Sequence, residues 1–590
     1  MWARFDDYSS RGRSMVLSDP VHEFVAHEAD QVTGVLRAAE DAARGDHWVA
    51  GFVTYEAAHG LDPSLPAIDW PAGHALAALP LAWFAAFARH EEVDAAHHAP
   101  GEGPRIDWSL DRDRIWHRDA VGTVREAIAA GDYYQLNLTA RLTAQVTDPH
   151  ELYVRLAKAQ PGAYNALIAA GDYTIVSASP ELFFARSGDE VLTRPMKGTT
   201  QRGRWPHEDR ARAQALRTSE KERAENVMIV DVMRNDLGRV AAMGSVEVPG
   251  LFETERYPTL WQLTSTVTAR VAPGTDLADI FSALFPSGSV TGAPKRAAMQ
   301  AIAAIEQRPR GVYCGAVGYL PPDPLEPAAR FSVAIRTVTR SNVSGYAEYG
   351  TGGAITWSSD PEVEFAELET KTVALTSPPL PERLIETLRF DPPQTLVNLD
   401  RHLARLSASA DYFGFRYRRG AVDAALAEAL EHRRALARVR IMLERSGAIR
   451  VQVEDFAPTP GVVRLGLAAD PVRSDDVLLF HKHAGRDVYD SARRSQPDVD
   501  DIVLWNERRE VTETTTANLA VHLDGRWWTP ALTAGLLPGV ERGRLIDLGV
   551  LAERAIAIEE LMHAERVAVV NSLRGWREVE LAAGHYFPRE

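Results

Sequence analysis

The chain has 590 residues, of which 45% are hydrophobic and 25% are charged, as in an ordinary soluble globular protein. This length allows about three or four domain-sized units. A formal net charge of -16 argues against a nucleic-acid or anionic-membrane partner. No apolar run reaches the roughly 18 residues of a membrane span, and residues 1–6 do not begin a signal peptide. We therefore expect a cytoplasmic protein that does not contact a membrane.

The chain contains one cysteine, Cys314. A single cysteine excludes an intramolecular disulfide framework and a cysteine-rich zinc site. Because Cys314 lies in the apolar, strand-like run R-G-V-Y-C-G-A (310–316), we expect it to be buried in the core. If the chemistry needs ammonia released from glutamine by a cysteine, this chain does not supply that cysteine.

The clearest domain boundary is the proline cluster T-S-P-P-L-P at residues 376–381, which predicts a short stiff linker. We therefore expect a first domain over residues 1–375, a linker over 376–383 and a second domain over 384–590. A weaker break at residues 95–104 is typical of a surface loop inside the first domain, so residues 1–105 form its less clearly patterned part.

The first domain mixes two periodicities. Residues 331–338 alternate with period two, which places Phe331, Val333 and Ile335 on one strand face and Arg336 on the other. Residues 206–242 are charged and helical in tendency. This mixture predicts an α+β fold, with helices packed outside sheets.

Lys197 lies in the run T-R-P-M-K-G-T-T (193–200), where a β-rich segment meets a Gly-Thr turn. A lysine amine held there can act as a covalent nucleophile if burial or a cationic neighbour lowers its pKa. An isolated turn lysine is usually solvated, so this interpretation depends on the residues around it.

Two pairs of glutamates have helical spacing. Glu222 and Glu225 are three residues apart, and Glu364, Glu367 and Lys371 fall at i, i+3 and i+7 on one face of another helix. Two acidic pairs on two helices match a Mg²⁺ site, in which waters or a substrate carboxylate complete the octahedron. A single pair at this spacing is usually a solvated helix face, so spacing alone does not establish the site.

Three longer runs resemble signatures of the chorismate-utilising enzymes, in family order across about residues 110–375. They are S-E-K-E-R-A-E-N-V-M-I-V-D with R-N-D-L (219–237), F-P-S-G-S-V-T-G-A-P-K (285–295) and the tail 364–371. The resemblance implies the chorismate-binding fold, with packed antiparallel sheets and outer helices. Anthranilate synthases carry a small residue at position 197, whereas lysine there marks aminodeoxychorismate synthase component I.

The resemblance also implies roles in catalysis. Lys197 would attack ring carbon C2 of chorismate while the C4 hydroxyl leaves, and ammonia would then enter at C4 and expel the lysine. Glu181 would protonate the departing hydroxyl, helped by apolar neighbours that raise its pKa. Glu225 and Glu367 are the first expected Mg²⁺ ligands. Glu222 and Glu364 are expected as further ligands, directly or through water.

The same resemblance assigns substrate-binding residues. Arg336, Tyr313 and Lys371 correspond to residues that hold the substrate carboxylates. Thr291 and Gly292 belong to a turn that opens a helix, so the free N–H groups of this turn could face an anion; an ordinary helix cap is the alternative. The chain departs from the family in one place, because a glutamine stands at position 262 where histidine is frequent. Glutamine cannot transfer a proton near neutral pH.

The second domain contains another ordered set of motifs. These are L-I-E-T-L-R (384–389), D-R-H-L-A-R-L (400–406), H-K-H (481–483), V-T-E-T-T-T-A-N (511–518), L-P-G-V-E-R (537–542) and N-S-L-R-G (571–575). Together they resemble the class IV aminotransferase family, the fold-type IV pyridoxal-phosphate enzymes that include aminodeoxychorismate lyase. An α+β second domain is therefore expected.

The class IV resemblance implies a pyridoxal 5'-phosphate site. Lys482 would bond to the cofactor aldehyde, and Glu513 would pair with the pyridine nitrogen. The expected phosphate ligands are Arg405, Gly539, Val540 and Ser572. Two departures raise the alternative of a degenerate site. The family's extra opening strand and turn are not evident before residue 384, and a glutamate stands at position 541 where threonine is frequent.

Together the two resemblances imply formation of 4-aminobenzoate, a folate precursor, from chorismate and ammonia in two steps. Because no glutaminase-like segment accompanies the single cysteine, we expect a separate glutamine amidotransferase partner or the use of free ammonia. Three alternatives stay open. The second domain could be a non-catalytic module or an amino-acid transaminase, and the first could be an anthranilate or salicylate synthase, which Lys197 disfavours.

Overall fold

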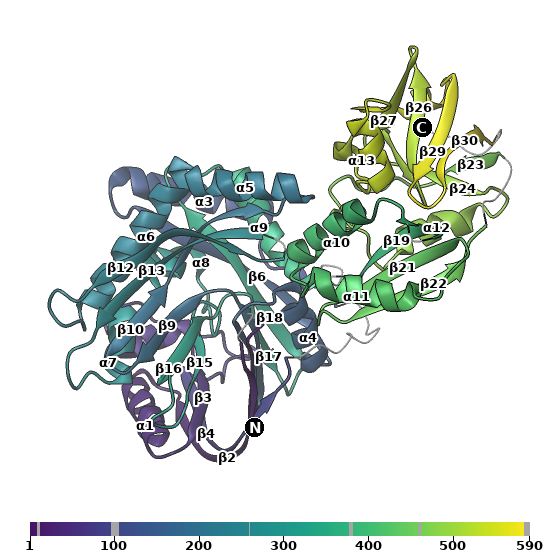
Figure 1. Cartoon of the computed structure of the whole chain (residues 1–590). Helices are drawn as coiled ribbons and strands as arrows, with labels where there is room; N and C mark the ends of the chain where they lie inside the picture. The colour runs from purple at the N-terminus through teal and green to yellow at the C-terminus, as the bar shows by residue number, and fades with distance from the viewer. Residues whose placement is uncertain are drawn as a thin grey trace. The chain divides into compact units, whose positions relative to one another are not determined.

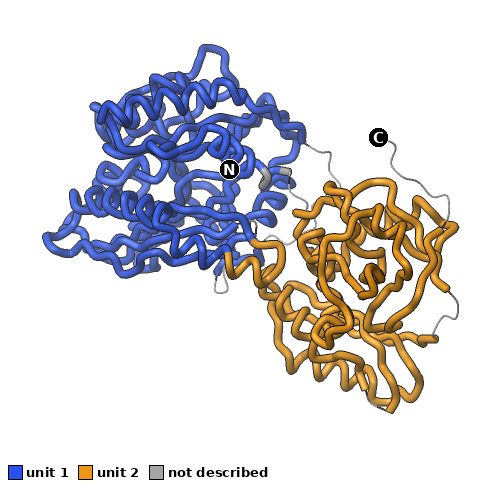
Figure 2. The backbone as a smooth tube through the Cα atoms, turned by 90° about the horizontal axis from the view of Figure 1, so that it is seen from above, with its two compact units in different colours: residues 1–202, 212–379 blue, residues 203–211, 380–590 orange. Residues whose placement is uncertain are grey.

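The computed structural model describes residues 1–8, 12–95, 106–258, 260–376, 381–393, 395–457 and 462–582. The chain divides into two compact units, which Figure 2 shows in different colours. Unit 1 comprises residues 1–202 and 212–379, and unit 2 comprises residues 203–211 and 380–590. Residues 377–380 of the predicted linker and residues 96–104 of the weaker break lie outside the described residues.

Unit 1 is built on strands β1 to β18. Their bounds are β1 Trp2–Asp6, β2 Ser14–Ala26, β3 Trp48–Val53, β4 Ala82–Val93, β5 Ser109–Leu110, β6 Gln135–Gln145, β7 Tyr164–Ala170, β8 Tyr173–Ser179, β9 Leu182–Ser187, β10 Glu190–Arg194, β11 Met196–Gln201, β12 Glu247–Arg256, β13 Leu260–Arg270, β14 Gly292–Ala293, β15 Ala316–Leu320, β16 Ala329–Val333, β17 Thr337–Ser341 and β18 Tyr346–Ile355.

These strands form a continuous antiparallel series. From β13, which pairs with both β11 and β12, the order runs β10, β9, β16, β15, β3 and β4. It continues through β2, β1, β7, β8, β17 and β18 to β6, on which β5 and β14 pair. The antiparallel sheets expected from the family resemblance are confirmed.

Helices pack against the strands of unit 1, and Figure 1 shows several of them on its outer faces. Their bounds are α1 Val32–Arg44, α2 Ala58–Leu61, α3 Arg114–Ala130, α4 Pro149–Ala159, α6 Glu220–Gly238, α7 Leu277–Leu284, α8 Lys295–Glu306 and α9 Pro361–Thr376. Helix α5 Pro206–Thr218 begins in the segment assigned to unit 2 and ends in unit 1. Short 3₁₀ turns η1 Ala29–Gln31, η2 Tyr55–Ala57 and η3 Gly288–Val290 join them. Helix α6 packs on β11 and β13, and α9 packs on β18.

Two local predictions are corrected. The helical segment expected over residues 206–242 is two helices, because Ser219 ends the first and caps the second by accepting from the Glu222 N–H at 3.4 Å. The strand expected over residues 331–338 breaks after Val333, since Arg336 has φ of 51°, which a β-strand does not accommodate. A continuous period-two pattern therefore spans two strands.

Cys314 is buried as predicted, with 1% of its surface exposed. Its backbone is not a strand, because Cys314 has φ of 64° and lies in a turn before β15. Burial raises the pKa of its thiol to about 12, so the group is an unreactive thiol at neutral pH.

The strands of unit 2 fall into two sheets. The first consists of β19 Arg383–Asp391, β20 Thr395–Leu396, β21 Ala437–Glu444 and β22 Ile449–Asp455. The second consists of β23 Val463–Leu467, β24 Asp501–Trp505, β25 Val511–Thr514, β26 Asn518–Leu523, β27 Arg526–Pro530, β28 Ala552–Arg554, β29 Arg566–Asn571 and β30 Gly575–Leu581. The first sheet is antiparallel, and the second is mixed because β23 runs parallel to β24 and β30.

Unit 2 also contains helices α10 Leu399–Phe413, α11 Arg419–Leu430, α12 Asp487–Ser495, α13 Val540–Asp547 and α14 Ile558–Met562, with 3₁₀ turns η4 Val477–Phe480 and η5 Leu532–Ala534. Segment 203–211 belongs to this unit although it lies early in the chain. Trp205 packs on Phe480 with ring centroids 5.3 Å apart, and Tyr412 donates a hydrogen bond to the Gly203 carbonyl at 2.8 Å. Sequence analysis did not anticipate this segment.

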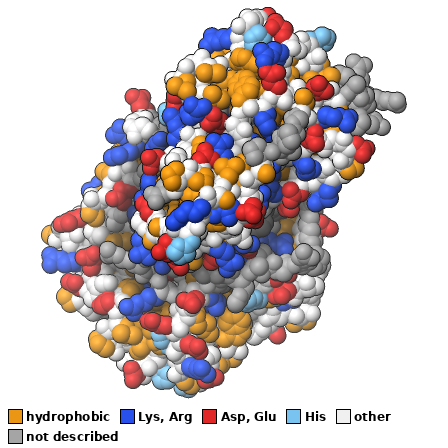
Figure 3. Space-filling model, turned by 45° about the vertical axis from the view of Figure 1, so that its right-hand side comes forward, with side chains coloured by type: hydrophobic (Ala, Val, Ile, Leu, Met, Phe, Trp, Pro, Cys, Tyr) orange, Lys and Arg blue, Asp and Glu red, His pale blue; other side chains and the backbone are white. Residues whose placement is uncertain are grey.

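Surface charge and helix hydropathy are the features that concern binding to nucleic acid and to a membrane. On the face that Figure 3 shows, Lys and Arg side chains are interspersed with Asp and Glu side chains. Within the part of the chain that the structure describes, no helix is both long enough and apolar enough to cross a membrane.

A buried ion pair anchors the loop that precedes β15. The Arg310 guanidinium donates to both carboxylate oxygens of Glu306, at 2.7 and 3.0 Å. It also donates to the carbonyls of Val290 and Asn137, each at 2.8 Å. The side chains of both charged residues are at most 3% exposed. This pair therefore joins α8, η3 and β6 at one point.

Because replacing Arg310 leaves the Glu306 charge buried without its partner, Arg310→Met should destabilise unit 1 by about 3–5 kcal/mol. Chemical unfolding followed by circular dichroism would measure this loss. Arg419→Met, which removes solvent-exposed ion pairs with Asp400 and Asp423, serves as the control and should leave the unfolding midpoint unchanged. Equal midpoints for the two variants would contradict the assigned role.

Candidate active sites

Lys197 lies at an irregular point of β11 in unit 1. The pairing of β11 with β13 is interrupted between Met196 and Thr199. Gly198 has φ of 102°, and a Cβ there would lie 3.0 Å from a carboxylate oxygen of Glu222. The interruption therefore places Lys197 beside the acidic face of α6.

Hydrogen bonds hold the backbone of this segment. Asn226 donates to the Lys197 carbonyl at 3.1 Å, and Ser265 donates to the Asn226 side-chain oxygen at 2.5 Å. Gln262 donates to the Gly198 carbonyl at 2.9 Å and accepts from the Thr199 hydroxyl at 3.0 Å. Gln262, which stands where the family frequently has histidine, therefore positions the segment that carries Lys197.

The Lys197 amine lies 3.6 Å from a carboxylate oxygen of Glu225, and only 14% of the lysine side chain is exposed. The exposed Lys221 reaches the same carboxylate at 4.0 Å. The structure thus brings the predicted nucleophile together with one of the predicted metal ligands.

The predicted carboxylates of α6 and α9 lie within electrostatic range of one another. Burial raises the pKa of Glu222, and the charges of Glu225 and Glu367 raise it further. Burial also raises the pKa of Glu364, to which the Glu367 charge contributes. Lys371 lies 2.8 Å from Glu367 and lowers the pKa of that carboxyl.

Among the described residues, no three His, Cys, Asp or Glu side chains are close enough together to hold a metal ion. The Mg²⁺ site therefore stays a prediction. Its donor set fits the ion, since Mg²⁺ prefers hard oxygen ligands and usually binds through one or two carboxylates plus waters. A bound cation would reduce the electrostatic repulsion between Glu222 and the carboxylates of Glu225 and Glu367.

Glu181 is buried between β8 and β9, two residues before Phe183, which belongs to a cluster of phenylalanine rings. Phe183 contacts Phe281 and Phe285 with ring centroids 5.8 and 5.9 Å apart. Burial raises the pKa of Glu181 to about 7, although Ser289 donates a 2.6 Å hydrogen bond to its carboxylate. This environment suits a carboxyl group that donates a proton near neutral pH.

The predicted substrate-binding residues lie on separate segments of unit 1. Thr291 and Gly292 follow η3, next to Ser289 and thus close to Glu181. Tyr313 is buried, and the Lys371 amine donates to the Gly352 carbonyl at 2.7 Å. The predicted helix after the turn is present, since α8 begins at Lys295.

Arg336 occupies the break between β16 and β17. Burial lowers the pKa of its guanidinium, and the nearby Tyr349 and Tyr257 hydroxyls oppose that shift. Tyr257 in turn donates to the Pro180 carbonyl, the residue before Glu181, at 3.0 Å. Arg336 therefore lies in the neighbourhood of the predicted acid.

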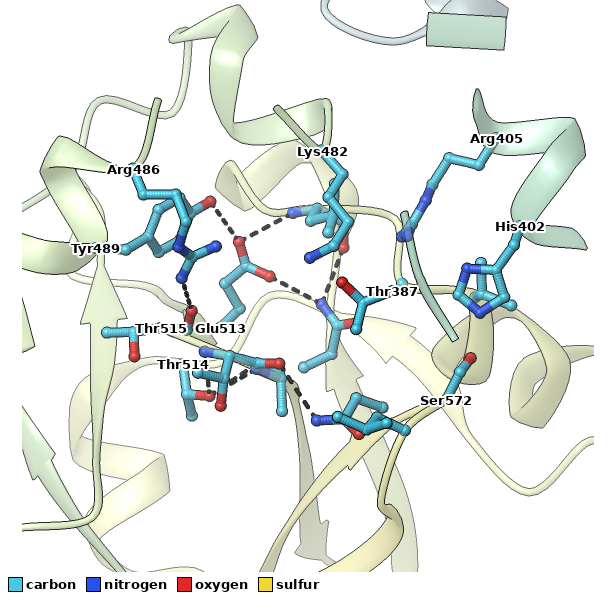
Figure 4. Close-up of a pocket in the computed structure, with 18 of the residues that line it drawn as sticks. Thr387, His402, Arg405, Lys482, Arg486, Tyr489, Glu513, Thr514, Thr515 and Ser572 are labelled. Atoms are coloured by element: carbon cyan, nitrogen blue, oxygen red, sulfur yellow. Dashed lines mark hydrogen bonds between the residues drawn. The ribbon is translucent and has the colours of Figure 1, made fainter. Parts of the chain in front are cut away.

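Unit 2 contains a cavity of about 250 Å³ around Lys482. Figure 4 shows Lys482 between Glu513 and Arg405, with Ser572 nearby. The cavity lining includes every predicted cofactor-binding residue, namely Arg405, Lys482, Glu513, Gly539, Val540 and Ser572. The structure therefore brings this whole set together.

Burial sets the chemistry of the two central groups of the cavity. It lowers the pKa of Lys482 to about 8, with the positive charge of Arg405 adding to the effect. It raises the pKa of Glu513 to about 7. Glu513 accepts hydrogen bonds from the Tyr489 hydroxyl at 2.9 Å and from the Asn518 amide at 3.2 Å. Tyr489 and Asn518 were not assigned roles from sequence.

Arg405 is held by a carboxylate that sequence analysis also left without a role. It donates twice to Glu386, at 2.7 and 2.9 Å, and once to the Pro538 carbonyl at 3.2 Å. Although burial opposes ionisation, Arg405 and His402 hold the pKa of Glu386 at about 2. Because a guanidinium has five N–H donors, two remain for a phosphate. The sequence feature that could have identified Glu386 was its position in the motif 384–389.

The unusual Glu541 does not oppose a phosphate. Its carboxylate accepts two hydrogen bonds from Arg544, at 2.7 and 3.0 Å, and one from Asn398 at 3.0 Å. It is also not among the residues that line the cavity. This departure from the family pattern therefore leaves the cavity suited to the cofactor.

Gly539 caps α13 at the cavity wall. A Cβ at this position would lie 1.7 Å from the Asn518 side-chain oxygen. The absence of a side chain at Gly539 thus lets Asn518 reach Glu513 and, at 2.9 Å, the Leu537 carbonyl. Asn518 therefore connects the start of α13 with the Glu513 carboxylate.

Each of the two units matches a known protein family. Residues 4–377 match the chorismate binding enzyme family, and residues 383–582 match the amino-transferase class IV family. The chain is 43% identical over 270 residues to an aminodeoxychorismate synthase of Streptomyces griseus, covering 45% of this chain and 36% of that protein. It is 38% identical over 283 residues to aminodeoxychorismate synthase component 1 of Escherichia coli, covering 48% and 61%.

Unit 1 also resembles a solved structure, that of anthranilate synthase component I from Streptococcus pneumoniae. The TM-score is 0.53 at 26% identity, covering 62% of this chain and 92% of that one. The chain spans less than two thirds of the two sequence relatives described above. It belongs to the chorismate binding enzyme family and carries, in unit 2, a class IV amino-transferase domain.

Proposed function

We propose that unit 1 converts chorismate and ammonia to 4-amino-4-deoxychorismate, and that unit 2 then releases pyruvate to leave 4-aminobenzoate. The family matches and the similarity to aminodeoxychorismate synthases support this reading. One observation carries the first step: the amine of the largely buried Lys197 side chain lies 3.6 Å from Glu225, beside the carboxylates of α6. A lysine in this place favours amination at C4 of chorismate over anthranilate formation.

The first step needs a nucleophile and an acid. The Lys197 amine attacks ring carbon C2 and gives up a proton, the double bond shifts, and the C4 hydroxyl leaves as water with a proton from Glu181. Ammonia then bonds to C4, the double bond shifts back, and Lys197 departs from C2. The two substitutions together exchange one hydroxyl for one amino group. A pKa of about 7 leaves Glu181 protonated in part of the molecules at neutral pH.

The carboxylates of α6 and α9 would hold Mg²⁺, with Glu225 and Glu367 as first ligands and Glu222 and Glu364 as further ones. The ion would supply positive charge that binds the ring carboxylate of the substrate. Ammonia would come from solution or from a separate glutamine amidotransferase subunit, because Cys314 is a buried, unreactive thiol.

The second step would use pyridoxal 5'-phosphate in the unit 2 cavity, where the bound cofactor supplies an electron sink. Glu513 would hold the pyridine nitrogen, and Arg405, Ser572 and the start of α13 would face the phosphate. Lys482 would take the ring proton of the substrate, since a pKa of about 8 leaves part of the amine neutral near pH 7. Loss of enolpyruvate would then complete the aromatic ring.

Incubation of the purified protein with chorismate, ammonium, Mg²⁺ and pyridoxal phosphate, followed by product identification, tests both steps. We expect 4-aminobenzoate and pyruvate in equal amounts. Anthranilate or salicylate as product would refute the proposed amination. Accumulation of aminodeoxychorismate alone would refute the second step and leave unit 2 as a non-catalytic module or an amino-acid transaminase, which amino donors with 2-oxoglutarate would distinguish.

Lys197→Ala should lower the rate of aminodeoxychorismate formation by at least about a hundredfold, because it removes the proposed nucleophile. Release of pyruvate from supplied aminodeoxychorismate should be unchanged. Lys221→Ala is the matched control, since Lys221 reaches the same Glu225 carboxylate from an exposed position. If both steps failed together in Lys197→Ala, or if Lys221→Ala were equally inactive, the lysine would be structural.

The pH dependence of the first step should reflect Glu181. Because burial raises its pKa to about 7, the acid is protonated below that value and the rate should fall as the pH rises through it. The Ser289 hydrogen bond stabilises the carboxylate, so Ser289→Ala should move this descending limb to higher pH. Ser282→Ala, which removes only a bond to the Ala278 carbonyl, should not move it. A limb that stays in place in Ser289→Ala would argue against Glu181 as the acid.

Gly539→Ala should weaken pyridoxal phosphate binding by about tenfold, because the new Cβ displaces Asn518 and removes a hydrogen bond from Glu513. Titration of the cofactor by its visible absorbance would measure the change. In Gly543→Ala, within the same helix, the nearest atom lies 4.0 Å away, so binding should match that of the original protein. Equal affinities for the two variants would show that the Gly539 contact is not needed.

A further inference from the structure

Residues 203–211 belong to unit 2, although the class IV amino-transferase match starts at residue 383. Figure 2 shows this segment in the colour of unit 2. The segment begins two residues after β11 ends, whereas the rest of the unit lies at or beyond position 380. Among the described residues that line the cavity around Lys482, none belongs to the segment. An effect of the segment on the cavity would therefore pass through the residues that it contacts.

Hydrogen bonds within the segment fix its shape. The Gly203 N–H donates to an Asp209 carboxylate oxygen at 2.9 Å, and the Arg204 N–H donates to Glu208 at 2.9 Å. The Arg204 guanidinium donates to the same Glu208 carboxylate at 3.1 Å. A Cβ at Gly203 would lie 2.1 Å from the Asp209 nitrogen, so this turn needs glycine. The turn presents Trp205 with the Arg204 guanidinium 4.8 Å from its ring centre.

Trp205 packs on the 3₁₀ turn η4, which ends at Phe480. The ring centroids of Trp205 and Phe480 are 5.3 Å apart, and the Arg204 guanidinium lies 5.6 Å from the Phe480 ring centre. Arg204 also donates to the Ser474 carbonyl at 3.2 Å, just before η4. Phe480 is 1% exposed and belongs to the largest apolar core of unit 2. Because Lys482 follows Phe480 by two residues, a displacement of η4 would move the lysine backbone.

A second contact of the segment leads to the residue just before Lys482. Tyr412 of α10 donates to the Gly203 carbonyl at 2.8 Å, and its ring centroid lies 4.5 Å from that of His481. His481 itself lines the cavity. The Lys482 carbonyl accepts from the Ile385 N–H at 2.9 Å, which ties the lysine backbone to β19. Two contacts of the segment therefore converge on the two residues that precede Lys482.

We propose that Trp205 is a positioning residue for Lys482, so that unit 2 depends on a segment from outside its class IV region to hold this amine in place. The proposal rests on the assignment of unit 2 as a pyridoxal-phosphate site, and it adds a residue that does not line that site. Bonding to the cofactor aldehyde requires the amine at one position, and a packed support outside the site fixes that position. Two aromatic rings in contact supply such support at little cost in conformational freedom.

Titration of the full chain with pyridoxal phosphate, followed by visible absorbance, tests this role without turnover. Trp205→Ala removes the ring that packs on Phe480, and Trp205→Phe keeps an aromatic ring there. Tyr412→Phe removes the hydrogen bond to Gly203 and keeps the ring beside His481. This third variant tests the second contact with the packing of the core retained.

Trp528→Ala is the matched control. Trp528 packs against the same apolar core as Trp205, and the guanidinium of Arg554 lies 5.2 Å from its ring centre. It is not among the described residues that line the cavity. The control therefore measures the effect of losing a packed tryptophan from this core.

We expect Trp205→Ala to bind pyridoxal phosphate at least about tenfold more weakly, because Lys482 loses its fixed position. Trp205→Phe should recover most of this affinity, and Tyr412→Phe should bind about threefold more weakly, the effect of one hydrogen bond. Trp528→Ala should match the original protein. Original affinity in both Trp205→Ala and Tyr412→Phe would overturn the proposal. An equal loss in Trp205→Ala and Trp528→Ala would also overturn it, because the effect would then come from the core as a whole.

The outcome is separable from that of the proposed function. If the variants followed the expected order of cofactor affinity but the original protein released no pyruvate from aminodeoxychorismate, the positioning role would stand and the lyase activity would not. If the original protein released pyruvate and Trp205→Ala and Tyr412→Phe bound the cofactor as tightly as it does, the lyase activity would stand and the positioning role would be refuted.

Discussion

The donors that replace water around each buried carboxyl group decide what the two sites can do. Glu181 receives one hydroxyl donor from Ser289, and burial raises its pKa to about 7. Glu513 accepts from neutral phenol and amide donors and has a similarly raised pKa. Glu386 is as deeply buried, but its contacts with Arg405 and His402 hold its pKa at about 2. A buried carboxyl group that accepts hydrogen bonds from neutral donors can therefore hold a proton near neutral pH. A buried carboxyl group with cationic partners stays ionised.

The same logic applies to the cations. Lys482 is buried next to Arg405, and both effects favour the neutral amine that the proposed chemistry needs. Glu386 accepts hydrogen bonds from Arg405 and so orients the guanidinium at the cavity wall. Glu386 therefore acts on the cavity through Arg405, although it does not line the cavity itself. In unit 1, Lys197 instead lies beside Glu225, so the two proposed catalytic lysines have different charged neighbours.

Two departures from the family patterns become intelligible once their contacts are known. Gln262 cannot transfer a proton, but its amide bonds Gly198 and Thr199 and so holds the backbone on the far side of Lys197. Glu541 stands near the expected phosphate, but Arg544 and Asn398 take up its carboxylate. Neither contact follows from the residue types alone, because each depends on a partner whose orientation is set by its own strand or helix.

The sequence by itself determined the division into a chorismate-binding part and a class IV part, and it placed Lys197, Glu181 and the residues around Lys482 in ordered motifs. These are local signals, since each motif is a short run whose residue types and spacing survive without knowledge of packing. Tertiary structure alone decided the break of the 331–338 strand at Arg336 and the assignment of residues 203–211 to unit 2. It also decided the contact between Glu386 and Arg405, because burial and pairing join residues that are far apart in the chain.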